Sequence, residues 1–351
     1  MTIRNIYRSI IEAKELPQVV QLEDSLYGAA FGLMKLLPAH HMLDRAKEQK
    51  FLDQSTTVVE STSGTFGLAL AMLCAIDKRP LVLVSDPAID AAFRLRLEDL
   101  GATVDIVRKP EAVGGYQAAR LARLREHQHR VSNHYWPRQY TNPDNVGAYS
   151  KVAEILVESL GEIDCLVGTV GSGGSVCGTS RFLRQLLPKL RVIGIDTPGS
   201  VLFGLPDAKR VLRGLGNSVH PTNLDHTAID EVHWVDGATA FLATRLLHRE
   251  AALFRGGTSG AAFLVARWWA RRNPGAKTVV LLPDEGDRYL TTIYDDNWLE
   301  AEGLRRSKLP EAPVEASSLA DVPANAWSRF DWRRRTFEAV TGQRYGSSEL
   351  L

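Results

Sequence analysis

Residues 56–76 read TTVVESTSGTFGLALAMLCAI, and this stretch decides the fold. Its β-branched start, 56–60, predicts a strand, and its apolar end, 66–76, predicts a largely buried helix. The small residues between them supply a tight turn from strand to helix. Strands that alternate with helices in this way are typical of a parallel sheet with helices on both faces. We therefore expect an α/β protein.

The same alternation continues on both sides of one interruption. Residues 135–147, YWPRQYTNPDNVG, break the periodicity with proline and asparagine and mark a domain boundary. We expect two three-layer αβα domains with mostly parallel sheets, at 1–145 and 146–303, and a C-terminal extension at 304–351. The first strands of the chain could join the second domain. Further strands are predicted at 80–86, 103–107, 164–170, 191–197 and 278–284, and further helices at 88–102, 148–161, 175–187, 259–272 and, in a basic segment, 330–340.

The composition disfavours several classes of function. With 351 residues, 44% of them hydrophobic, the chain can bury a large core in two domains. Forty-two Lys and Arg against 41 Asp and Glu give a net charge of +1, which favours neither nucleic acid nor a membrane as partner. The three cysteines lack disulfide-frame or zinc spacing, so we expect no metal and a reducing, cytoplasmic location. The N-terminus lacks the apolar core of a signal peptide.

A glycine-rich turn, GSGGSVCG at 171–178, joins a predicted strand to a predicted helix. Its backbone N–H groups and the positive end of the helix would converge on an anion, above all a phosphate. Ser172 and Ser175 could add hydroxyl donors. A tight connection that needs glycine for its backbone angles explains the turn equally well. The turn has neither the lysine of a P-loop nor the GxGxxG spacing of a dinucleotide site.

A second turn, STSGTFG at 61–67, places hydroxyl groups beside the start of the predicted helix 66–76. Thr62, Ser63 and Thr65 suit the carboxylate of an amino-acid substrate. From this turn alone, the stronger interpretation is that one hydroxyl merely caps the helix.

These motifs resemble those of the fold-type II pyridoxal-phosphate enzymes, in the cysteine synthase and cystathionine β-synthase family. VVESTSGTFGLALAM is similar to the family's substrate-carboxylate loop, and GTVGSGGSVCGTSRFL to its cofactor-phosphate loop. The correspondence keeps its order from about residue 17 to 300, and it implies tryptophan synthase β-like domains. The likeness is greatest to the cysteine synthase homologues that include a siderophore-pathway, O-phosphoserine-dependent synthase. It is carried by VVESTSG, VSDP, VGGY, DTPGSVLFG and GDRYLTTIYDDNWL.

The resemblance implies that Lys35 carries pyridoxal 5'-phosphate as a Schiff base and acts as the general base. The family spacing back from residues 62–64 reaches Lys35, and Pro38-Ala39 follows at the expected place. Leu36-Leu37 stand where the family usually has Asp-Arg. An alternative register puts Leu43-Asp44-Arg45 on the family's Lys-Asp-Arg; it would leave no catalytic lysine.

The resemblance also implies a role for each motif residue. Thr65 would contact both cofactor and substrate, and Glu285 stands where cysteine synthases place a serine facing the pyridine nitrogen. A carboxylate there would favour a protonated ring and a stronger electron sink. Glu285 could instead pair with Arg255 or Arg288, or Asp284 could be a strand-end cap. The cofactor phosphate would be held by Gly171, Ser172, Gly173, Gly174 and Ser175, and the substrate carboxylate by Thr62, Ser63, Gly64, Thr65, Gln139 and Gly214.

The function implied is that of a homodimeric transferase acting on a small amino acid. It would replace the β-substituent of O-acetyl- or O-phospho-L-serine with sulfide, another thiol or an amine. Two alternatives stay open. Glu285 favours the carbanion chemistry of a β-eliminating, deaminating lyase or a racemase, and the register without a lysine predicts an inactive binding protein.

Overall fold

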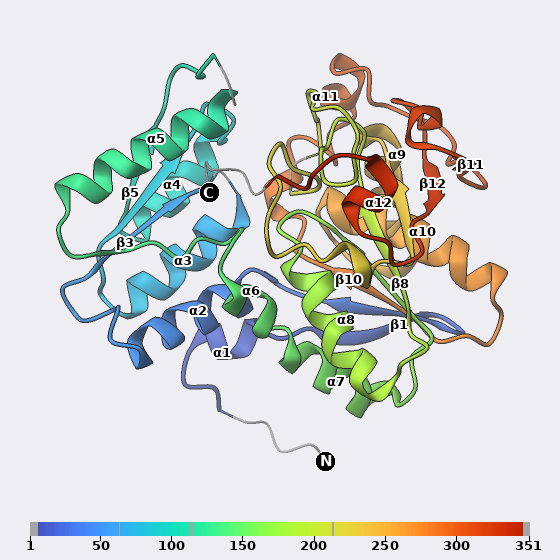
Figure 1. Cartoon of the computed structure of the whole chain (residues 1–351), viewed down its shortest axis with the longest axis horizontal. Coiled ribbons are helices and arrows are strands. Elements are labelled where there is room, and N and C mark those ends of the chain that lie inside the picture. Colours follow the sequence, from blue (N-terminus) through green and yellow to red (C-terminus); the bar gives the residue numbers. More distant parts are fainter. Residues whose placement is uncertain (1–5, 63, 113–114, 213, 347–351) are drawn as a thin grey trace. The chain divides into compact units, whose positions relative to one another are not determined.

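The chain forms two compact units, each with its own sheet (Figure 1). The first unit consists of Met1–Gln18 and Phe31–Pro137, and the second of Val19–Ala30 and Arg138–Leu351. The computed structural model describes residues 6–62, 64–112, 115–212 and 214–346 of these units.

The first unit is built on a four-stranded parallel sheet. Its strands lie in the order β5 (Ala102–Ile106), β4 (Leu81–Ser85), β3 (Thr57–Ser61) and β6 (His134–Tyr135). The helices of this unit are α1 (Ile10–Lys14), α2 (Leu36–Glu48), α3 (Thr65–Ile76), α4 (Ala91–Asp99) and α5 (Gly115–Arg130).

Helix α3 is the centre of the first unit's core. Every residue from 66 to 71 is buried, as its apolar composition requires, and α3 packs against α2. Helix α2 contributes Leu36 and Met42 to the same core, whereas Asp44 and Lys47 on its other side stay partly exposed and pair with each other. This packing fixes the start of α2, and with it the residue that directly precedes the helix.

An eight-stranded sheet runs through the second unit. Its strands lie in the order β1 (Gln18–Glu23), β2 (Leu26–Ala30), β10 (Thr278–Leu282), β7 (Cys165–Thr169), β8 (Arg191–Asp196), β9 (Glu231–Trp234), β12 (Ser328–Asp331) and β11 (Val314–Glu315). From β2 to β9 neighbouring strands are parallel, whereas β12 runs antiparallel to β9. The dark-blue N-terminal strands therefore belong to the sheet of the C-terminal half (Figure 1).

Helices and short turns surround this sheet. They are α6 (Pro143–Gly147), α7 (Ser150–Leu160), α8 (Gly174–Leu186), α9 (Gly237–Ala251), α10 (Gly257–Arg272), α11 (Asp296–Ala301) and α12 (Phe337–Thr341), with 3-10 turns at His226–Ala228, Asp287–Tyr289 and Leu319–Asp321. Helix α10 packs against α9 and against strands β7 and β10. Its residues Phe263 and Val265 join Leu282 of β10 in one core.

The predicted α/β class with mostly parallel sheets is confirmed. The two compact units divide at 137/138, whereas the expected boundary is at 145/146. Segment 19–30 belongs to the second unit, which is the arrangement that the sequence analysis allowed for the first strands. Within the predicted C-terminal extension, β11 and β12 complete the second unit's sheet.

The helix predicted over 330–340 is wrong for its first part. Residues 330 and 331 end strand β12, whose alternate residues are buried, residues 332–336 form a turn, and only α12 is helical. Phe330 packs inward, while Arg329 on the other face pairs with Glu231 and Glu315. The arginines at 333–335 lie in the turn after β12, where Arg333 pairs with Asp331 and Arg334 with Asp230, so they do not form one face of a helix. Among the residues that the structure describes, no helix is long and apolar enough to cross a membrane.

Candidate active site

Lys35 lies directly before helix α2, at its N-cap position. Its neighbours Met34 and Leu36 are buried, and Lys35 itself is half-buried. Because burial disfavours the charged ammonium, the pKa of Lys35 falls from its ordinary 10.5 to about 8. A sizeable fraction of its amine is therefore neutral near neutral pH, as an amine must be to attack a carbonyl carbon.

The turn from β3 to α3 holds the predicted carboxylate-binding residues of the first unit. Thr62 is buried; its N–H donates to the carbonyl of Val84 (3.0 Å), and its Oγ1 accepts from the N–H of Gly64 (3.2 Å). Helix α3 begins after Gly64, which has no side chain to cap it, and Thr65 is its first residue. The simple capping interpretation is therefore not supported by the described residues. Ser63, like Val113 and Gly114 of the VGGY motif, lies outside them.

The glycine-rich turn of the second unit joins β7 to α8, as predicted. Gly173 has φ +83°, and a Cβ placed on it would lie 2.6 Å from the Cα of Leu224. A Cβ on Gly174 would lie 2.2 Å from Oδ1 of Asn145. Both positions thus need glycine, and the turn presents its backbone at the N-terminus of a helix of 13 residues. Ser172 is buried beside them and Ser175 is half-buried.

Three asparagines that the sequence analysis did not single out hold this turn in place. Asn145 Nδ2 donates to the carbonyl of Gln139 (2.5 Å) and to Oγ of Ser172 (3.4 Å). Asn223 Nδ2 also donates to the Gln139 carbonyl (3.1 Å), and Asn217 Nδ2 donates to the Gly171 carbonyl (3.3 Å). The structure therefore brings Gln139 next to the glycine-rich turn.

Gly214 also lies next to the glycine-rich turn. Its carbonyl oxygen is 3.3 Å from the position that a Cβ of Gly171 would take, and its φ is +81°. The second unit thus brings together the five predicted phosphate-binding residues, 171–175, and two predicted substrate-binding residues, Gln139 and Gly214. Asn217 and Asn223 were the available sequence signals of this role, since asparagine side chains often form hydrogen bonds with loop backbones.

Two adjacent carboxyl groups follow strand β10. Asp284 is buried, and its Oδ2 accepts a 2.8 Å hydrogen bond from the hydroxyl of Tyr289. Burial raises the pKa of Asp284. Glu285 is exposed, its backbone bridges to Arg255, and its charge stabilises the Arg255 guanidinium. The Glu285 carboxylate is therefore close enough to Arg255 to act on its charge and is accessible to solvent, while the pairing of the two side chains stays a prediction.

The chain belongs to the family of pyridoxal-phosphate dependent enzymes, whose model matches residues 15–284. It is 34% identical over 335 residues to N-(2-amino-2-carboxyethyl)-L-glutamate synthase of Cupriavidus metallidurans. The matched stretch covers 90% of this chain and 98% of that protein.

Solved structures agree with this membership. The O-acetylserine-dependent cystathionine β-synthase of Helicobacter pylori is 26% identical, with a TM-score of 0.76 over 83% of this chain and all of that one. A hydrogen sulfide-producing enzyme of Fusobacterium nucleatum is 25% identical, with a TM-score of 0.75 over 81% of this chain and all of that one.

The cofactor of this enzyme is pyridoxal 5'-phosphate, and the described residues fit it. The first unit offers a lysine whose pKa is lowered by burial, and the second offers a turn that only glycine can form at a helix N-terminus. By its family the chain is a pyridoxal-phosphate dependent enzyme, and the similar proteins include synthases, one of them O-acetylserine-dependent.

Proposed function

We propose that this enzyme joins the β-carbon of an O-activated L-serine to the amine of L-glutamate. The observation that carries the proposal is the 34% identity, over nearly the whole of both chains, to a synthase named for that carbon–nitrogen product. Acetate and phosphate both remain candidates for the leaving group. Acceptance of sulfide in place of glutamate would keep the same reaction class with a different nucleophile.

We assign Lys35 two tasks in this reaction. Its Nζ would hold the cofactor covalently and, once the substrate amine has displaced it, would accept the proton from the substrate α-carbon. A pKa of about 8 suits a general base near neutral pH, because it combines basicity with a useful neutral fraction. When bound, pyridoxal phosphate supplies the electron sink that makes the α-proton removable.

We assign the remaining predicted residues to binding. The N–H groups at the start of α8 and the hydroxyls of Ser172 and Ser175 would hold the cofactor phosphate, because a helix N-terminus favours an anion. In the first unit, the turn 62–65 is our candidate to bind the substrate carboxylate, and in the second unit Gln139 is a candidate for the same group. Asn145 would act as a positioning residue, since it fixes both the Gln139 backbone and Ser172.

A β-eliminating lyase is the second candidate, and Glu285 is the observation that favours it. An accessible carboxylate at the ring nitrogen would stabilise the protonated ring and strengthen electron withdrawal. A stronger sink helps expulsion of the leaving group whether or not a nucleophile is present.

We further propose that the enzyme is a homodimer acting in the cytoplasm. The cysteines Cys74, Cys165 and Cys177 are buried free thiols, which suits a reducing compartment. Light scattering coupled to size-exclusion chromatography would test the dimer; a mass of one chain across a range of concentrations would contradict it.

The test of function uses the cofactor-loaded enzyme with O-acetyl-L-serine or O-phospho-L-serine, each with L-glutamate, with sulfide, or alone. Mass spectrometry should find the carbon–nitrogen product with glutamate and one of the two donors. Pyruvate and ammonia formed at the same rate with and without a nucleophile would establish elimination instead. Lys35→Ala should abolish turnover, whereas Lys189→Ala, at an exposed lysine, should leave it unchanged.

A further inference from the structure

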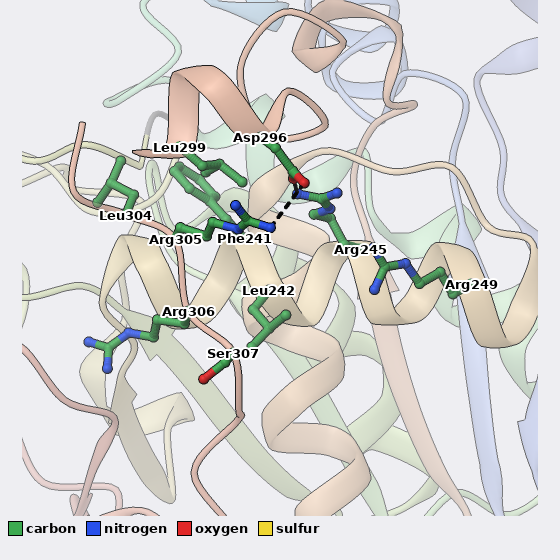
Figure 2. Close-up of a pocket in the computed structure, with 10 residues that line it drawn as sticks. All are labelled: Phe241, Leu242, Arg245, Arg249, Asp296, Leu299, Leu304, Arg305, Arg306 and Ser307. Atoms are coloured by element: carbon green, nitrogen blue, oxygen red, sulfur yellow. Dashed lines mark hydrogen bonds and ion pairs between the residues drawn. The ribbon is translucent and has the colours of Figure 1, made fainter. Parts of the chain in front are cut away.

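The second unit contains a pocket that shares no residue with the candidate active site. It has a volume of about 540 Å³ and lies beside helices α9 and α11 (Figure 2). Four arginines line it: Arg245 and Arg249 from α9, and Arg305 and Arg306 from the segment after α11. Volumes of this size are typical of small-molecule sites.

Positive charge exceeds negative charge in this pocket. Asp296 is the one acidic lining residue that the structure describes, and it pairs with Arg245 and, at 3.3 Å, with Arg305. Outside the lining, Glu300 pairs with Arg305 and Asp236 pairs with Arg306. Four cations against these three carboxylates leave one positive charge.

Arg249 is the source of the surplus. Among the described residues it makes no ion pair or hydrogen bond, although its charge helps Arg245 to lower the pKa of Asp296. An ion-pair network that only fastened α11 and the following segment to α9 would be complete without Arg249. The side chain of Arg245 is also only 18% exposed, while its guanidinium shares a single carboxylate, that of Asp296, with Arg305.

The rest of the lining is apolar. Phe241 and Leu242 of α9, Leu299 of α11, and Leu304 stand beside the arginines in Figure 2. Asp296 already shows the chemistry that the pocket accepts, since its carboxylate is held between two guanidinium groups. An external ligand would need an oxyanion for the arginines and a carbon frame for the apolar wall.

We propose that this pocket binds a small organic dianion whose carboxylate or phosphate groups are carried on an apolar carbon frame. The ligand's oxyanions contact Arg249 and share Arg245 with Asp296, while its frame lies against Leu242 and Leu304. This site is independent of the reaction proposed above.

The test is calorimetric titration of the cofactor-loaded enzyme at constant ionic strength. Adipate is the carboxylate probe and phenyl phosphate the phosphate probe; inorganic phosphate, which lacks a carbon frame, is the comparison. We expect saturable binding of one molecule per chain by at least one organic probe, with inorganic phosphate bound more weakly. The two organic arms decide which oxyanion the pocket prefers.

Three variants decide where the probe binds. Arg249→Gln should weaken binding about tenfold, because it removes a charge-assisted hydrogen bond. Asp296→Asn should strengthen binding, because it removes the internal competitor for Arg245. Arg181→Gln, at an exposed arginine of α8, is the matched control and should change nothing. No saturable binding by either organic probe, or equal affinity in wild type and Arg249→Gln, would overturn the proposal. Turnover measured on the same samples reports on the proposed function separately.

Discussion

Substitution of Gly173 by alanine should weaken cofactor binding and lower stability through two separable effects. Gly173 has φ +83°, which costs an alanine about 1–2 kcal/mol. The new Cβ would also stand 2.6 Å from the Cα of Leu224, a backbone atom that cannot turn aside. Overpacking of this kind costs a further ~1–3 kcal/mol. The total is about 2–5 kcal/mol.

The second unit supplies a matched control. Gly275 has φ +86°, but a Cβ placed on it meets nothing within 4 Å, so Gly275→Ala isolates the backbone cost. For a unit of this size, each 1 kcal/mol lowers the melting temperature by roughly 2–4 °C. The apo form of Gly173→Ala should therefore melt at least ~2 °C below that of Gly275→Ala.

Cofactor titration, followed by absorbance, completes this experiment. Gly275→Ala should bind pyridoxal phosphate as the wild type does, because residue 275 lies in the loop before β10 and away from the predicted cradle. Gly173→Ala should bind at least about tenfold more weakly, because the displaced turn no longer directs its N–H groups at one phosphate. Equal melting temperatures and equal cofactor affinities in the two variants would refute the assignment of the turn.

Two further predictions concern the candidate site. The rate at which apoenzyme incorporates the cofactor should rise with pH about a midpoint of about 8, because only neutral Lys35 reacts; stopped-flow absorbance would show a roughly fivefold increase from pH 7 to pH 8. A midpoint near 10.5 would contradict the buried environment of Lys35. Glu285→Ser should lower the ratio of pyruvate to replacement product by roughly tenfold if the carboxylate raises the pKa of the pyridine ring nitrogen by about one unit. Glu302→Ser, at an exposed position on the C-terminal side of α11, is its control, and an unchanged ratio would place Glu285 outside the electronics of the reaction.

Local patterns in the sequence predicted the parts of the fold that depend on local causes. The strand and helix on either side of the glycine-rich turn were predicted within about one residue of β7 and α8, because the turn needs glycine and the flanking runs are strongly apolar. The pairing of β2 with β10 could not be predicted in this way. These strands are some 250 residues apart, and side-chain propensity does not name a strand's partner.

The same limit applies to the candidate site. Asn145 belongs to a stretch whose proline and asparagine content predicted only a boundary, yet its side chain joins Gln139 to Ser172. Its role depends on the approach of two segments about 30 residues apart, which composition does not encode. Lys35 was located by spacing within a family pattern, and its lowered pKa could be known only from the packing around α2.

The end of strand β10 shows how a buried group can decide what an adjacent group presents. Asp284 Oδ1 lies 2.5 Å from where a Cβ of Gly256 would stand, so the glycine makes room for the carboxyl, and Tyr289 donates to its other oxygen. Side chains of neighbouring residues in extended chain point to opposite sides. Once Asp284 is enclosed, Glu285 must therefore point away from that enclosure, where it is exposed. The accessibility of Glu285, on which both its predicted pairing with Arg255 and its proposed effect on the cofactor depend, thus follows from the packing of Asp284.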